Sequence, residues 1–162
     1  GRSALPARSE MCIRDSFILV HGAYHQPLHW EPLVKVLQQS GHRTSTPRLP
    51  SVSATPIPDC LAADISAVKT AVLDAIASGS ESVVPIFHSY GGIPGFEALA
   101  TLTDEEKSKI PKVVCISAFI VPKGDSLVSV QKPDSRMKWW VLDMVVMWWF
   151  IFSFVLQVLW VL

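Results

Sequence analysis

The residues of this sequence whose types and spacing are suited to catalysis lie in two glycine-containing turns. Phe87-His88-Ser89-Tyr90-Gly91 places a serine two residues after an apolar run, and His21-Gly22-Ala23 follows another apolar run. A serine on a sharp turn between a strand and a helix, with glycines beside it, presents its hydroxyl as a nucleophile. The pattern predicts acyl transfer through Ser89.

Acyl transfer also requires two N–H donors for the oxyanion that develops during the reaction. Tyr90 is predicted to supply one, because the N–H after the nucleophile lies at the positive end of the following helix. Ala23 is predicted to supply the other, since Gly22 lets the backbone of the second turn approach closely. The pocket beside these donors is expected to be lined by residues of both turns, namely His21, Gly22, His88 and Gly91.

The histidines near these turns have structural interpretations beside chemical ones. His21 is interpreted as a hydrogen-bonding residue that fixes its loop, and His88 as packing beside the turn, with a general-base role as the alternative for each. His25 and His29 have the four-residue spacing of metal ligands on a helix, but no third ligand accompanies them. We therefore expect no metal and no cofactor.

Strands and helices that alternate along the chain position these turns. Strands are predicted over residues 17–20, 83–87 and 113–121, with a weaker edge strand over 42–49. Helices are predicted over residues 30–39, from the N-cap Asp59 to Gly79, and over 93–102, where Pro94-Gly95 is expected to break the first turns. This alternation indicates an α/β fold, a partial doubly wound parallel sheet covered on both faces.

Two smaller patterns complete the prediction for the helices. The second helix is expected to bury one apolar stripe, formed by Leu61, Ile65, Val68, Val72 and Ile76. Thr103 and Glu106 have the spacing of a capping box, which explains the acidic run beside them without catalysis.

Charge and cysteine content exclude several classes of protein. The formal net charge of the 162 residues is zero, so the chain has no basic surface for a nucleic acid. The 3 cysteines are odd in number and include no CxxC pair, which argues against a disulfide framework and a zinc site. A cytoplasmic location is the default expectation.

Both ends of the sequence differ from the domain between them. Residues 1–15 show no apolar period and are predicted to be a disordered or artefactual arm before a domain over 16–130. Residues 131–162 are a linker and an apolar tail, predicted to be helical, in which 139–162 approach the roughly 20 residues that cross a bilayer. Three interpretations of this tail remain open: a membrane helix, a buried helix and a mistranslated segment. A membrane helix would make the protein membrane-associated.

The motifs together resemble the α/β-hydrolases of the methylesterase and hydroxynitrile-lyase-like branch. The resemblance covers about residues 17–130 and rests on runs that match in order and spacing: 17–23, Trp30, Gly41-His42, 88–92 and 113–119. It implies Ser89 as nucleophile, Ala23 and Tyr90 as oxyanion donors, a small ester-like substrate, and a small lid after the strand that ends near Val121.

Two departures from the family pattern shape the functional prediction. Phe87 stands where the family usually has glycine, which is expected to crowd the exit of the strand. The family order is serine, acid, histidine, and no histidine follows His88. The sequence therefore predicts the N-terminal half of a carboxylic-ester hydrolase, truncated and inactive or nearly so. A membrane-tethered, non-catalytic binding protein and a non-functional fragment are the alternatives.

Overall fold

A four-stranded parallel sheet is the centre of the fold in the computed structural model, which describes residues 15–53, 55 and 58–125. The chain divides into two units, Gly1–Ile120 and Val121–Leu162, and the sheet with its helices belongs to the first. The prediction of a parallel sheet is confirmed. The arm over 1–14, the apolar helix expected within 131–162 and nearly all of the expected lid lie outside the described residues.

The strands have the order β2-β1-β3-β4. Their bounds are Asp15–Val20 for β1, Arg43–Ser45 for β2, Ser82–His88 for β3 and Val114–Ile116 for β4. β1 and β3 lie inside the sheet, which explains why both read as continuous apolar runs. β2 lies at an edge as predicted, although it is shorter than the run over 42–49.

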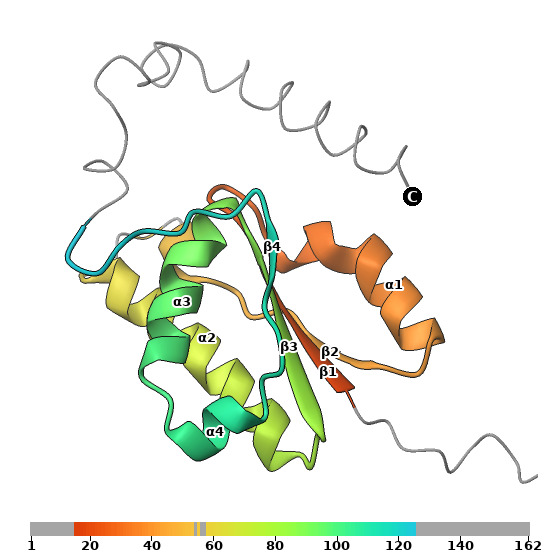
Figure 1. The fold of residues 1–162 in the computed structure, drawn as a ribbon. Helices are drawn as coiled ribbons and strands as arrows, with labels where there is room; N and C mark the ends of the chain where they lie inside the picture. The colour runs from red at the N-terminus through yellow and green to blue at the C-terminus, as the bar shows by residue number, and fades with distance from the viewer. Residues whose placement is uncertain (1–14, 54, 56–57, 126–162) are drawn as a thin grey trace, which may run out of the picture. The chain divides into compact units, whose positions relative to one another are not determined.

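Helices cover both faces of the sheet (Figure 1): α2 and α3 lie on one face, and α1 lies on the other. The helices are α1 Glu31–Gln39, α2 Cys60–Ala77, α3 Gly92–Ala100 and the short α4 Asp104–Ser108. Three 3-10 turns, η1 Pro27–Trp30, η2 Pro50–Val52 and η3 Ser89–Gly91, join them to the strands. The first and last of these follow the carboxyl ends of β1 and β3, where sites form in parallel sheets.

The ends of the helices follow the predicted signals. The side chain of Asp59 accepts a hydrogen bond from the Ala62 N–H and caps α2. Gly41 and Gly79 follow α1 and α2 with φ of +86° and +81°, the left-handed conformation that glycine adopts without a Cβ clash. The Thr103 hydroxyl accepts from the Glu106 N–H, and the Glu106 carboxylate accepts in return, so the capping box is confirmed.

Several predicted boundaries and contacts were wrong. Pro94 does not break α3, because it lies in the first turn, where its missing N–H has no partner to lose. Trp30 belongs to η1 and not to α1. Asp15, assigned to the arm, begins β1. β4 ends at Ile116, well short of residue 121, because Ser117 turns the backbone with a φ of +44°.

The hydrophobic core lies between the sheet and the helices α2 and α3. Phe87 and Ile18 from the strands meet Val68 and Val72 from α2, and all four are fully buried. Leu61, predicted to belong to this stripe, is 39% exposed, and the inward position of the next turn is held by Asp64. A carboxylate at a core position needs a reason beyond packing.

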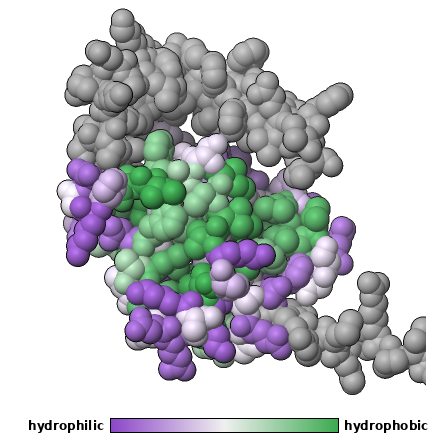
Figure 2. All heavy atoms as spheres, viewed as in Figure 1, coloured by the Kyte–Doolittle hydropathy of each residue, from purple (hydrophilic) through white to green (hydrophobic). Residues whose placement is uncertain are grey.

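Apolar residues gather over the face on which β4 lies (Figure 2). Val114 is 38% exposed, and the outer edge of β4 has no strand beside it among the described residues. No helix within the described ranges combines the length and the hydropathy that a bilayer crossing requires. Residues 139–162, to which the membrane prediction applies, lie outside those ranges, so membrane association and a cytoplasmic location both stay predictions.

Candidate active site

Ser89 lies in a strained turn between the buried strand β3 and the helix α3. Its φ is +50°, a left-handed conformation that costs a non-glycine residue on the order of 1–3 kcal/mol. The surrounding structure holds this conformation, because the Ser89 carbonyl accepts a hydrogen bond from the Phe119 N–H at 3.0 Å. The serine is partly exposed at the carboxyl end of the sheet. The sequence motif therefore forms the expected strand, sharp turn and helix.

The two glycine-containing turns interlock at this point. A Cβ on Gly91 would lie 2.7 Å from the His21 carbonyl oxygen and 2.8 Å from that of Val20. A Cβ on Gly22 would lie 2.9 Å from Nδ1 of His88 and 3.0 Å from Cβ of Ser89. Only glycine permits these approaches. The structure thus brings Gly22 and Gly91, two of the predicted pocket residues, into direct contact with the opposite turn.

Phe87 occupies the position where the family usually has glycine, and Gly95 makes room for its ring. A Cβ on Gly95 of α3 would lie 2.6 Å from Cζ of the Phe87 ring. The ring also makes an edge contact with Phe96, at 5.3 Å between centroids. α3 therefore approaches the strand closely enough to bury Phe87 completely while leaving the turn at Ser89 intact.

His21 fixes the conformation of its loop. The ring is 1% exposed; Nδ1 bonds the Gly22 carbonyl at 2.9 Å, and Nε2 accepts from the Leu49 N–H at 3.2 Å. Burial lowers the pKa of this imidazole, which matches the neutral tautomer that both bonds require. The interpretation of His21 as a loop-fixing residue agrees with these bonds, which occupy both ring nitrogens.

Aromatic rings from the loop after β1 surround His88. The centroid of the His25 ring lies 5.2 Å from that of the His88 ring, and the centroid of the Trp30 ring lies 6.3 Å from it, both in edge contact. His25 also contacts His29 at 4.9 Å, and its Nδ1 bonds the Ala23 carbonyl at 2.8 Å. Burial, followed by the neighbouring His25 and His21, lowers the pKa of His88 to about 4. His88 packs beside the turn as a neutral ring.

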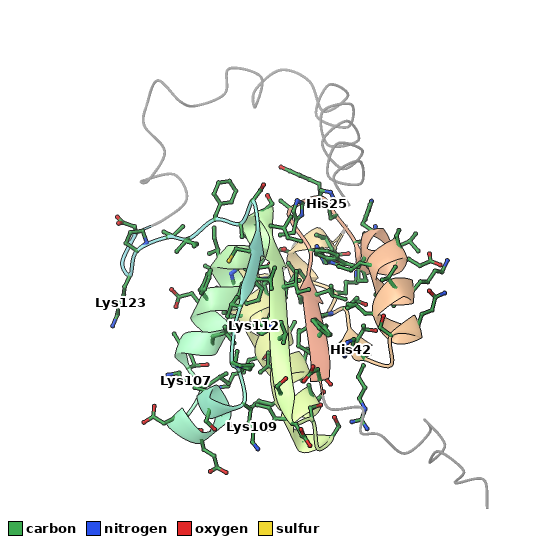
Figure 3. All side chains as sticks on the ribbon, turned by 45° about the vertical axis from the view of Figure 1, so that its right-hand side comes forward. His25, His42, Lys107, Lys109, Lys112 and Lys123 are labelled. Carbon is green, nitrogen blue, oxygen red and sulfur yellow. The ribbon has the colours of Figure 1, made fainter. Side chains whose placement is uncertain are left out.

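His42 belongs to a different part of the fold. It lies toward the end of the sheet opposite His25 (Figure 3), with its Nδ1 4.0 Å from the Asp15 carboxylate. Its ring makes an edge contact with Phe17 at 5.0 Å. Within the described residues, no group of three or more histidine, cysteine, aspartate or glutamate side chains has an arrangement that would hold a metal ion.

Asp64 is a residue of this region that the sequence analysis missed. It is 0% exposed, and its Oδ2 accepts a hydrogen bond of 2.9 Å from the Tyr90 hydroxyl. Its Oδ1 accepts another from the Ser51 N–H, also at 2.9 Å. The signal that would have found it is its position: Asp64 precedes Val68 and Val72 at four-residue steps, on the buried side of α2.

The predicted oxyanion donors differ in how the structure connects them. Tyr90 follows Ser89 in η3 and is anchored by its side chain to α2. Ala23 lies directly after Gly22, and its N–H donates no hydrogen bond within the part of the chain that the structure describes. Their roles in stabilising an oxyanion stay predictions.

Comparison with known proteins places this geometry in a family. Residues 17–158 match the sequence model of the alpha/beta hydrolase family. An alpha/beta hydrolase of Aspergillus novofumigatus is 28% identical over 125 residues, which are 75% of this chain and 50% of that protein. A carbendazim hydrolyzing esterase of Nocardioides sp. is 29% identical over 119 residues, 71% of this chain and 46% of the esterase. The chain thus spans about half the length of these relatives.

The branch suggested by the motifs is also represented among the matches. An alpha-hydroxynitrile lyase of Arabidopsis thaliana is 28% identical over 109 residues, 66% of this chain and 41% of the lyase. The structure of polyneuridine aldehyde esterase shares the fold with a TM-score of 0.58 at 23% identity, over 80% of this chain and 51% of that one. Tomato methylketone synthase I gives a TM-score of 0.54 at 25% identity, over 70% of this chain and 43% of the synthase. The chain belongs to the alpha/beta hydrolase family.

Proposed function

We propose that this chain carries the nucleophile and the oxyanion donors of a carboxylic-ester hydrolase, with Ser89 as the nucleophile. The observation that carries the proposal is the positive φ of Ser89 between a buried strand and a helix. Strain at a non-glycine residue persists only where the surroundings enforce it, and such residues cluster at functional sites. Ser117 also has a positive φ, but Ser89 differs from it by its place between a buried strand and a helix and by the contact of Gly22 with its turn.

The N–H groups of Tyr90 and Ala23 serve as the oxyanion donors in this proposal. The close approach of Gly22 to Ser89 supports the pairing, since it brings the two turns to within contact distance. The Ala23 N–H is not engaged by another described residue. Developing negative charge on a carbonyl oxygen would meet these two dipoles and the start of α3.

The proposal gives the chain no general base. His21 has both ring nitrogens engaged, and His42 lies toward the other end of the sheet. No hydrogen bond between a histidine and the Ser89 hydroxyl is found among the described residues. In the proposed step, no described histidine activates Ser89, and its hydroxyl proton passes to solvent.

Small carboxylic esters are the proposed substrates. A carbendazim hydrolyzing esterase and an alpha-hydroxynitrile lyase are among the relatives, and both names refer to small molecules. In the proposed step, Ser89 Oγ bonds to the carbonyl carbon and its hydroxyl proton passes to water. The bond to the leaving oxygen breaks, and the leaving alkoxide takes up a proton from water. The product is an acyl-serine, which accumulates because no base activates the water that would cleave it.

The test is acetylation of the full chain by p-nitrophenyl acetate, followed by nitrophenolate absorbance and by peptide mass spectrometry. We expect acetyl-Ser89 to form faster than the acetyl ester of any other hydroxyl group in the chain, because the proposed oxyanion donors lie beside Ser89. Ser89→Ala should abolish this signal. Ser117→Ala is a matched control, because Ser117 also has a positive φ at the end of a strand. Equal acetylation of the wild type and Ser89→Ala would refute the proposal.

A further inference from the structure

The buried Asp64 carboxylate has no part in the chemistry proposed above, yet it joins three elements around the site. It comes from α2, it accepts from the Ser51 N–H in η2, and it accepts from the Tyr90 hydroxyl in η3. Each of its two oxygens has a donor of its own. The carboxylate therefore ties the turn that holds Ser89 to a helix and to a loop.

Packing alone does not explain a carboxylate at this position. Val68 and Val72 hold the same face of α2 one and two turns later, and both are fully buried. An apolar residue would fit there without the cost of removing a charge from water. A buried carboxylate is retained at such a position when its hydrogen bonds order something that an apolar side chain would leave free.

The hydrogen bond from Tyr90 has the features of a strong anchor. The donor–acceptor distance is 2.9 Å, the acceptor is fully buried, and Tyr90 is itself only partly exposed. Burial raises the pKa of the Tyr90 phenol above its ordinary range, and the bond to Asp64 raises it further. The phenol thus stays protonated and continues to donate well above neutral pH.

We propose that Asp64 is a positioning residue: by holding the Tyr90 phenol, it fixes the backbone N–H of Tyr90 where the oxyanion develops. This inference rests on the proposed function. Tyr90 directly follows the strained Ser89, so a free Tyr90 side chain would let the peptide between them rotate. With the far end of the ring anchored to α2, that rotation is restricted, and the donor is oriented before the substrate binds.

The experiment compares Asp64→Asn, Tyr90→Phe and the double variant in the full chain. Asp64→Asn keeps the shape of the side chain, removes its charge and leaves one acceptor oxygen for two donors, the Ser51 N–H and the Tyr90 hydroxyl. Asp74→Asn is the matched control, since Asp74 is an exposed carboxylate on the same helix. The limiting rate of Ser89 acetylation and the half-saturating concentration of p-nitrophenyl acetate are measured separately, with circular dichroism reporting the fold of each variant.

A spectroscopic measurement tests the anchor independently of catalysis. The chain contains 2 tyrosines, so a Tyr24→Phe background leaves the phenol of Tyr90 as the only tyrosine that titrates. Alkaline difference absorbance then follows the ionisation of Tyr90. We expect Asp64→Asn to move this titration to lower pH, because the variant lacks the carboxylate that raises the pKa of the phenol. An unchanged titration in the folded variant would show that Asp64 does not hold the phenol, and would overturn the inference.

Each single variant is expected to lower the limiting acetylation rate by about 10-fold and to leave half-saturation unchanged. The double variant should lose no more than either single variant, because both remove the same anchor. Losses that multiply in the double variant, or an unchanged rate in folded Asp64→Asn, would overturn the inference alone. If Tyr90→Phe is folded and retains the wild-type rate, the inference fails even if Asp64→Asn does not fold. A wild-type chain no faster than Ser89→Ala overturns the proposed function and this inference with it.

Discussion

Gly95→Ala tests the packing that lets α3 lie against Phe87, next to the turn that holds Ser89. The added Cβ would lie 2.6–2.7 Å from three carbons of the Phe87 ring, where ordinary contact begins at 3.4 Å. The ring is fully buried and in edge contact with Phe96, so it has no free space into which to move. The substitution therefore forces either the ring or the helix to shift by about 0.8 Å to reach that limit.

The net effect is a balance of two opposing terms. Overpacking of this kind costs about 1–3 kcal/mol. Replacing glycine by alanine inside a helix stabilises the folded state by up to about 1 kcal/mol, because alanine has the higher helix propensity. We expect Gly95→Ala to lower the free energy of unfolding by about 1–2 kcal/mol, because the contact is with a rigid ring and not with the end of a flexible side chain.

A double-mutant cycle with Phe87→Leu isolates the cause. Urea unfolding of the full chain, followed by far-UV circular dichroism, gives the free energy for the wild type, both single variants and the double variant. In the Phe87→Leu background, Gly95→Ala should be neutral or stabilising, a coupling of about 2 kcal/mol. An equal loss of stability in both backgrounds would refute the reasoning, since it would show that the added methyl group does not meet the ring.

Two further predictions concern pH and the contact between the turns. The pKa of His88 is lowered to about 4 in the folded chain, from an ordinary value of 6.5. Between these two pH values the ring therefore binds a proton in the unfolded chain and not in the folded chain. The free energy of unfolding should thus fall between pH 6.5 and 4 by at most about 3 kcal/mol for this ring, which is partly exposed. His88→Asn should flatten this fall in urea unfolding at the two pH values, and an equally steep fall in that variant would contradict the assignment. Gly91→Ala places a Cβ 2.7 Å from the His21 carbonyl oxygen, so the two turns must move apart. This variant should reduce the rate of Ser89 acetylation by more than about 10-fold. Acetylation at the wild-type rate would show that the contact between the turns does not matter.

The sequence alone determined the class of fold and the position of the sharp turn that holds Ser89. The runs that became β1 and β3 are continuously apolar because both faces of an interior parallel strand are covered. Ser89, Gly91 and Gly22 were identifiable because local turn geometry restricts which residues fit. Such local constraints act over a few residues, so they can be read from the order of the chain.

Only the tertiary structure decided what surrounds that turn. Asp64 is 26 residues from Tyr90 in the chain, and nothing local predicts that α2 brings its carboxylate to that phenol. Gly95 was predicted to break α3, whereas its missing side chain makes room for Phe87. The early end of β4 likewise depends on the turn at Ser117. These features arise from contacts between elements distant in sequence, whose partners are fixed only when the helices pack on the sheet.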